Sequence, residues 1–362
     1  MSGGAVRNLR ALLQCASCRF GALYYVPFCA GMAAAGTLSL ATALLGAAFW
    51  LTLGMAIEVT NRLADRVEDA VNRPERTALC ETVGWELLAR VQLLLWGLVV
   101  VATAVWVALA PNALLLLLLV SGAGFGLAYS RGPRLARHRA LVFVVLSGTF
   151  VGPFCLGVAA GDPLAGTAST AGFAQLGEFV PLFWVLTLFI SSLAGIKDIT
   201  DRAGDEAIGY RSAFVAFAER HGTAALTALA AVPFAALVGF VAAGQLPARA
   251  LALLVFLPLS AGVALAVRGA HDRPADQLLV REALYDHWLA FTTATLLVCF
   301  PSLGLLAALA GAWLWWLVAS RWLHWGAPLR LADLPRVVAL ATAGGARQRS
   351  TVPVPATAEA NA

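Results

Sequence analysis

Charged side chains are scarce in this sequence. Only 12% of its 362 residues are Asp, Glu, Lys or Arg, about half the share that is typical of soluble proteins. A chain that is 60% hydrophobic cannot cover a water-soluble surface with so little charge, so a soluble globular protein is excluded. The composition predicts an integral membrane protein instead.

Lysine, histidine and cysteine are also rare. Lys197 is the single lysine, so the other 24 of the 25 basic residues are arginines. The five histidines are dispersed, and the six cysteines include one C-x-x-C pair, Cys15 and Cys18. A zinc site needs a second such pair or histidines close by. The pair is therefore interpreted as small apolar side chains near a membrane face.

Long apolar runs are what the chain has in abundance. Most are close to the ~20 residues with which a helix crosses ~30 Å of hydrocarbon. The last run is long enough for two crossings folded at Pro301–Gly304. We expect an all-α, polytopic membrane bundle of nine helices, or ten, around a central cavity. The runs are Ala22–Ala35, Leu40–Thr60, Leu87–Ala110, Leu114–Ala128, Ala140–Ala160, Phe179–Ile196, Ala224–Ala243, Ala250–Val267 and His287–Val318.

Basic residues fall in alternate connections between these runs. They gather before the first run and in 62–76, 131–139, 197–220 and 268–281, whereas the intervening connections have one basic residue at most. By the positive-inside rule, the N-terminus and the charged loops face the cytoplasm of a cell membrane. With ten crossings the arginines of the tail would lie on the cytoplasmic side too, whereas nine crossings would leave them outside. No cleavable leader is expected, because the first apolar run continues straight into the bundle.

Three segments follow from this organisation. Residues 1–19 form a basic cytoplasmic N-terminal segment, and residues 20–325 form one transmembrane domain. Residues 326–362, rich in Ala, Pro and Arg, lack a sustained apolar period and are expected to be a poorly ordered tail.

Two acidic stretches on the same predicted membrane side interrupt this apolar chain. In the first, Asn61, Asp65 and Asp69 are spaced i, i+4, i+8, and a helix would carry all three on one face. In the second, Asp198, Asp201 and Asp205 are spaced i, i+3, i+7 and share a face in the same way. Ion pairing in solvated loops accounts for neither the choice of Asp over Glu nor the repeated register.

Converging carboxylates repel one another unless a cation lies between them. Mg²⁺ fits such a site, because it takes one or two carboxylates, keeps several waters and completes its shell with phosphate oxygens. Basic residues interleave with the acids and can hold the outer oxygens of a diphosphate; they are Arg73, Arg76, Lys197, Arg202 and Arg211. The site opens at an apolar bundle, so the sequence predicts a diphosphate with a lipid tail.

These motifs together resemble the UbiA superfamily of intramembrane prenyltransferases. The chain has N-x-x-x-D-x-x-x-D followed by NRPER, then a Y-S-x-x-P loop, then K-D-x-x-D-x-x-x-D with a trailing G-x-R. The resemblance extends from about the first apolar run to the ninth. It implies a helical bundle with a central cavity, in which Mg²⁺ assists the ionisation of a prenyl diphosphate.

The resemblance also assigns residues. It implies that Asn61, Asp65, Asp69, Asp201 and Asp205 hold the metal, and that the four aspartates among them are catalytic. Residues implied in substrate binding are Asn61, Arg73, Tyr129, Ser130, Arg137, Lys197, Asp198 and Arg211. Membrane lipids and an aromatic or lipid acceptor are the other partners expected, and no nucleic acid is.

The chain departs from the family pattern at several positions. Arg62 follows Asn61 where family members commonly have Asp, and the segment after NRPER reads TALCETVG. Gly132 stands where the middle loop usually has a second proline. These departures place the chain off the best-known branches, which make quinones, haem precursors or chlorophyll.

Two fates of the allylic cation stay open at this point. If an acceptor enters, the product is a prenylated aromatic or lipid, which is the outcome that the family favours. If the double bonds of the tail capture the cation, a C15–C25 prenyl diphosphate gives a cyclic terpene. A transporter is a third reading, but transport sites lie near mid-membrane, whereas these acids lie at loop mouths.

Overall fold

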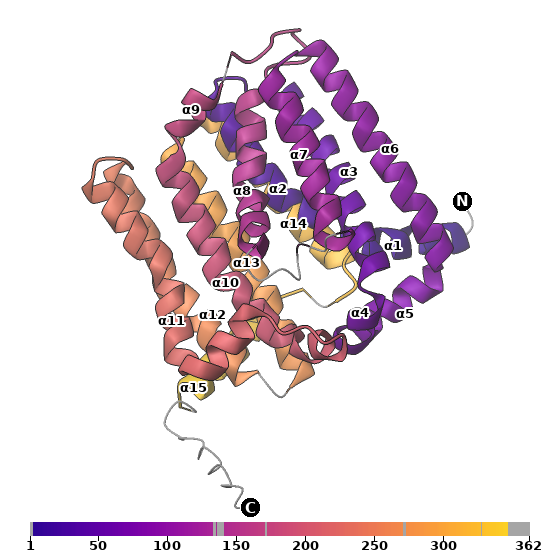
Figure 1. The fold of residues 1–362 in the computed structure, drawn as a ribbon, viewed down its shortest axis with the longest axis vertical. Coiled ribbons are helices and arrows are strands. Elements are labelled where there is room, and N and C mark those ends of the chain that lie inside the picture. The colour runs from indigo at the N-terminus through magenta and orange to yellow at the C-terminus, as the bar shows by residue number, and fades with distance from the viewer. Residues whose placement is uncertain are drawn as a thin grey trace, which may run out of the picture.

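The computed structural model describes residues 3–132, 135, 141–170, 172–270, 273–326 and 328–346. Within these residues the chain is a bundle of long helices, and its single β-bridge joins Asp162 to Thr167. The long helices run side by side, and the short helices α4 and α5 lie across one end of the bundle (Figure 1). The fold is therefore all-helical, as predicted.

The helix bounds follow the apolar runs closely. The long helices are α2 (Phe20–Ala34), α3 (Leu40–Ala64), α6 (Trp85–Leu109), α7 (Ala113–Ser130), α8 (Leu141–Ala159), α10 (Val180–Ala207), α11 (Ala213–Ala242), α12 (Phe256–Gly269), α13 (Pro274–Cys299) and α14 (Leu303–Trp322). The shorter ones are α1 (Gly3–Cys15), α4 (Arg66–Asn72), α5 (Pro74–Val83), α9 (Phe173–Gly177), η2 (Ala248–Val255), η3 (Leu331–Asp333) and α15 (Leu334–Ala346).

Six of the described helices are long and apolar enough to cross a membrane, or seven if the two halves of α10 form one bent span. Helix α2 and the described part of α8 are apolar but shorter, and α13 carries charged residues in its first half. Adding these three would give ten crossings, and that count, like the count of nine, stays a prediction. The last apolar run does consist of two helices, because α13 ends at Cys299 and the Ser302 hydroxyl caps α14.

The outer helices expose hydrocarbon rather than polar groups. On α6, the side chains of Leu93, Leu94, Val100 and Val101 are all at least 60% exposed. A soluble helix turns such residues inward. The apolar exterior is the surface expected of a bundle that has lipid as its solvent.

Helices α2 and α8 approach so closely that their backbones touch. A Cβ atom added at Gly31 would collide with the Phe154 carbonyl oxygen, and one at Gly157 would collide with that of Phe28. Small residues permit such contacts between membrane helices, and the contacts are stabilised by dispersion between the two backbones. This pair holds α8 against the centre of the bundle, where it lines the cavity described below.

Gly31→Val is expected to destabilise the protein by at least about 3 kcal/mol, the upper end of ordinary overpacking, because the new side chain meets backbone and not a movable side chain. Thermal unfolding in detergent measures the effect. Gly97→Val on α6 is the matched control, since an added Cβ has nothing within 4 Å there. Equal melting temperatures for the two variants would contradict the packing argument.

The expected disordered tail is wrong for its first part. Helix α15 packs along α12, and backbone meets backbone where Gly269 faces Leu340 and Gly344 faces Leu265. Small residues again make this approach possible, and short apolar repeats of Ala and Val do not reveal it in the sequence. The rest of the predicted tail, 347–362, lies outside the described residues.

Candidate functional site

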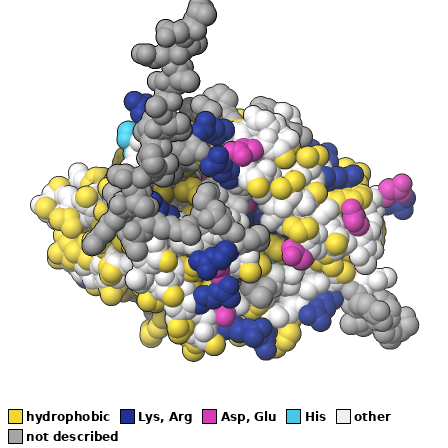
Figure 2. Space-filling view, turned by 90° about the horizontal axis from the view of Figure 1, so that it is seen from below, with side chains coloured by type: hydrophobic (Ala, Val, Ile, Leu, Met, Phe, Trp, Pro, Cys, Tyr) yellow, Lys and Arg dark blue, Asp and Glu magenta, His cyan; other side chains and the backbone are white. Residues whose placement is uncertain are grey.

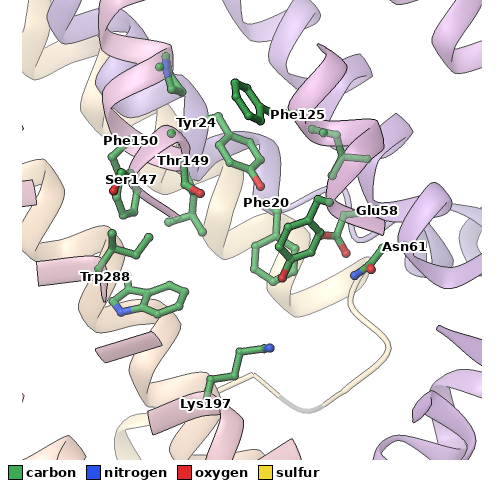
Figure 3. Close-up of a pocket in the computed structure, with 18 of the residues that line it drawn as sticks. Phe20, Tyr24, Glu58, Asn61, Phe125, Ser147, Thr149, Phe150, Lys197 and Trp288 are labelled. Carbon is green, nitrogen blue, oxygen red and sulfur yellow. The ribbon is translucent and has the colours of Figure 1, made fainter. Parts of the chain in front are cut away.

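One cavity of about 790 Å³ brings the two acidic stretches together. Its polar end is lined by residues of α3, α4, the second half of α10 and α13. Figure 3 shows Asn61 and Lys197 approaching this space from opposite sides, with Glu58 beside Asn61. On the outer surface of this end, Lys and Arg side chains are spread among fewer acidic ones, and hydrophobic side chains frame them (Figure 2).

The spacing of the first acidic stretch predicted one continuous helix, and that prediction is wrong. Helix α3 ends at Ala64, and Asp65 is the junction to α4, with backbone angles outside the helical range. The backbone hydrogen bonds nevertheless continue, because Asp65 N donates to Asn61 O at 2.9 Å and Asp69 N donates to Asp65 O at 2.8 Å. All three side chains therefore still line the cavity.

The second acidic stretch behaves as its spacing predicted. It lies on α10, which bends by 54° between Leu193 and Lys197. Asp198, Asp201 and Asp205 follow the bend on one face, and all three line the cavity with Lys197. Among the described residues, Asp205 makes no ion pair, whereas Asp201 is held by several cations.

Asp69 is surrounded by arginines. Arg76 donates a hydrogen bond to its Oδ1, an Arg73 nitrogen lies 3.5 Å from Oδ1, and an Arg62 nitrogen lies 3.8 Å from Oδ2. Burial by itself raises the pKa of Asp69, but the charges of Arg76, Arg73 and Arg62 outweigh it and hold the pKa below its ordinary value. Asp69 is therefore ionised at neutral pH.

Asp201 is the second centre of charge. Its carboxylate accepts from Arg73 Nη2 at 2.8 Å and from Arg281 Nη2 at 2.6 Å, and Lys197 Nζ lies 3.1 Å away. Arg73 thus contacts one aspartate from each acidic stretch. The ion pairing that sequence reasoning set aside for the aspartates exists at Asp69 and Asp201, because arginines from α5, α13 and the loop before α5 reach them.

Asn72 fastens the two stretches to each other. Its Nδ2 donates to the Asp201 carbonyl oxygen at 2.8 Å, and its Oδ1 accepts from Gly204 N at 2.8 Å. Gly204 has no room for a side chain, since an added Cβ would lie 2.6 Å from Glu68 O. Helix α4 is therefore clamped on α10 by backbone contacts that no charge pattern predicts.

Some of the remaining predicted residues lie at the cavity and others do not. Tyr129 lines the cavity, and Ser130 lies behind it and donates from Oγ to Asn61 Oδ1 at 2.9 Å, which orients that amide. Arg211 is exposed and does not line the cavity, although its neighbour Tyr210 does. Arg137 lies outside the described residues.

Sequence reasoning missed Arg281 on α13, together with several neighbours. Arg281 is 4% exposed and its Nε has no partner in the described part of the chain. The charged residues in the first half of α13, Arg281 among them, were the available indication, because such residues in membrane helices usually serve function. The other lining residues outside the two stretches include Arg19, Glu58, Tyr285, Trp288, His324 and Trp325.

The rest of the cavity wall is apolar and rich in aromatic rings. Phe20, Tyr24, Phe125, Phe150 and Trp288 surround the space beyond the charged end (Figure 3). The cavity volume is within the range of ~300–1,000 Å³ that is usual for small-molecule sites. A ligand with one anionic end and one apolar end matches this division.

The donor set suits a hard cation, although no cage is preformed. The described residues contain no group of three His, Cys, Asp or Glu side chains arranged to hold a metal ion. Mg²⁺ does not require one, because it is usually bound through one or two carboxylates together with water and phosphate oxygens. A carboxylate has about four acceptor positions, and Arg73, Arg281 and Lys197 use those of Asp201. A cation at Asp201 would therefore replace one of these contacts.

Comparisons with known proteins identify a family and structures with a related fold. A family model for the UbiA prenyltransferase family matches residues 24–288. A structure of a UbiA homologue from Archaeoglobus fulgidus bound to GPP and Mg²⁺ has a TM-score of 0.53 at 14% identity, and the match covers 79% of this chain and 99% of that one. The same homologue bound to DMAPP and Mg²⁺ has a TM-score of 0.50 at 14% identity, covering 78% and 99%.

At these identities the structural likeness supports the fold alone. A search of curated protein sequences finds no match to the chain. The family match covers well over half of the chain and includes both acidic stretches. The chain therefore belongs to the UbiA prenyltransferase family, whose members are integral membrane proteins.

Proposed function

We propose that this protein ionises a prenyl diphosphate in the membrane with the help of Mg²⁺ and transfers the prenyl group to an aromatic or lipid acceptor. One observation carries the proposal. A single cavity has both acidic stretches at one end and an apolar, aromatic wall over the rest. A prenyl diphosphate has the same two parts, and a UbiA homologue from Archaeoglobus fulgidus binds GPP or DMAPP with Mg²⁺.

The residues that would hold Mg²⁺ are the aspartates at the polar end. Asp65, Asp69, Asp201 and Asp205, with the amide oxygen of Asn61, supply hard oxygen ligands from two sides of the cavity. When bound, Mg²⁺ neutralises the negative charge that develops on the departing diphosphate. Active-site loops on the cytoplasmic side remain part of this proposal.

Basic residues would bind the outer oxygens of the diphosphate. Arg73 and Lys197 already line the polar end and point toward Asp201. An arginine fork matches two phosphate oxygens at once, so the guanidinium can exchange a carboxylate for the substrate without losing a charged partner. Asp198 supports Lys197 electrostatically, while Arg137 and Arg211 stay predictions.

The apolar wall would hold the prenyl tail and protect its cation. Ring faces attract positive charge, and the rings of Tyr24, Phe125, Phe150 and Trp288 border the space in which the cation forms. Exclusion of water lengthens the lifetime of the cation. The same aromatic wall supports a second candidate function, in which the tail cyclises on itself without an acceptor.

The test is an incubation of the purified protein with C15–C25 prenyl diphosphates and Mg²⁺, with and without acceptors. We expect little turnover until a hydroxybenzoate, a quinol precursor or a lipid alcohol is supplied, and a prenylated product afterwards. A cyclic hydrocarbon formed from the prenyl diphosphate alone would replace transfer by cyclisation. No diphosphate release under any condition would refute both.

A further inference from the structure

The segment after α14 closes one side of the cavity. His324 and Trp325 line it, although both lie beyond the residues that match the family model. Two hydrogen bonds from side chains of α1 hold this segment in place. Arg10 Nε donates to Trp322 O at 3.0 Å, and Gln14 Nε2 donates to His324 O at 3.0 Å. The chain thus adds its own residues to the family site.

His324 belongs to a buried charged network. Its Nε2 lies 3.4 Å from Glu282 Oε1, and Arg19 binds both oxygens of Glu282 at 2.5 and 2.9 Å. Ser320 Oγ lies 3.4 Å from Arg19 Nη1, so the N-cap residue of α2 contacts side chains of both α13 and α14. Because Arg19 holds the Glu282 carboxylate in place, the carboxylate can fix the orientation of the imidazole ring beside it.

The His324 ring has unused hydrogen-bonding capacity. The residue is 7% exposed, its Nε2 faces Glu282, and its Nδ1 has no hydrogen-bond partner among the described residues. Leaving a buried polar group without a hydrogen bond costs about 1–3 kcal/mol. Such a group in a native structure therefore calls for an explanation, and a catalytic role is one. Burial and the charge of Arg19 lower the pKa of His324, while the Glu282 carboxylate opposes this shift by stabilising the protonated ring.

His324 also lies beside the diphosphate end of the cavity. The guanidinium of Arg76 sits 5.4 Å from the ring centre of Trp325, and the same guanidinium binds Asp69. Among the described residues that line the cavity, His324 is the only histidine. His287, by contrast, is buried outside the cavity with its Nε2 at 2.8 Å from Ser260 Oγ.

We infer that His324, oriented by Glu282 and Arg19, accepts the proton that leaves the product in the last step of the reaction; the inference rests on the proposed function. Ionisation breaks the bond between C1 of the prenyl group and oxygen, and the electron pair leaves with the diphosphate. An acceptor carbon or oxygen then forms a bond to C1. Its C–H or O–H bond breaks, the electron pair stays on the acceptor, and the proton passes to an imidazole nitrogen.

Cyclisation also requires a base that removes a proton. A C–H bond beside the last cationic carbon breaks, its electrons become the double bond of the product, and the proton goes to the base. The assignment is therefore independent of which fate the cation follows. Glu58 is already engaged, because its carboxylate accepts a hydrogen bond from Arg62. The departing diphosphate is the other rival for the proton.

The experiment measures diphosphate release and product formation separately in single turnovers of the full-length protein, for His324→Gln and Glu282→Gln. For His324→Gln we expect diphosphate release within about threefold of wild type and a loss of final product of at least about 100-fold, the usual contribution of a general base. Water should capture the cation, so prenyl alcohol should accumulate. Glu282→Gln should show the same split to a smaller degree.

His221→Gln is the matched control, because His221 is exposed on α11 and does not line the cavity. His324→Ala with added imidazole separates loss of a base from misfolding, since a misfolded protein would not recover product. Parallel loss of diphosphate release and product in His324→Gln, without imidazole rescue of His324→Ala, would overturn the inference. Unchanged product would overturn it too and assign the proton to the diphosphate. Absence of diphosphate release from wild type would instead refute the proposed function.

Discussion

Asp65→Asn is expected to reduce diphosphate release by at least about 1,000-fold, and chelation of Mg²⁺ should do the same to the wild-type protein. Asp65 stands at the α3–α4 junction and lines the cavity. Asparagine keeps the shape and one oxygen but removes the charge that attracts the cation. Stabilisation of a departing diphosphate by metal is worth several kcal/mol, and each factor of ten in rate corresponds to about 1.4 kcal/mol.

The control for this variant is Glu75→Gln, because Glu75 is exposed on α5 and does not line the cavity. It should keep diphosphate release within about twofold of wild type. Added Mg²⁺ should restore the chelated wild type but not Asp65→Asn. Full activity of Asp65→Asn in the presence of chelator would rule out the metal site.

Asp201→Asn is expected to lower the free energy of unfolding by about 3–5 kcal/mol, in addition to abolishing activity. Asp201 is 6% exposed, and its carboxylate contacts Arg73, Arg281 and Lys197. Without it, three cations are left crowded at the cavity wall, and the loss of a compensating charge in a buried site is costly. Thermal or denaturant unfolding in detergent measures the loss.

Glu206→Gln is the comparison for stability. Glu206 pairs with Arg202 on the exposed side of the same helix, and exposed pairs contribute about 0–1 kcal/mol. Combining Asp201→Asn with Arg281→Met should recover part of the lost stability, because the second change removes one of the uncompensated charges. Equal stability of Asp201→Asn and wild type would show that the cations do not depend on Asp201.

The position of Arg73 suggests how the site stays assembled between turnovers. Arg73 contacts Asp69 on α4 and Asp201 on α10, so it neutralises both acidic stretches at once. Asn72, its neighbour, fixes the two backbones. We expect the guanidinium to move onto the diphosphate while Asn72 holds the helices, so that substrate replaces a charge contact without opening the fold.

The sequence by itself predicted the membrane environment of the protein and which acidic residues share a helix face. Scarce charge and long apolar runs predict a membrane bundle, and helices occupy those runs. Local spacing predicted that Asp198, Asp201 and Asp205 share one face, because residues three and four apart are neighbours on any helix. The same reasoning failed in part at Asp65, where the helix ends although the hydrogen-bond pattern continues.

Only the tertiary structure decided which distant residues join the site. Arg281 reaches Asp201 across 80 positions of sequence, and Arg19 reaches Glu282 across 263. Helical periodicity carries no information about which helices pack together, since that depends on where glycines such as Gly31 and Gly157 allow backbones to touch. For the same reason, His324 reads in the sequence as one of five dispersed histidines. Packing of the chain after α14 against α1 places it at the cavity.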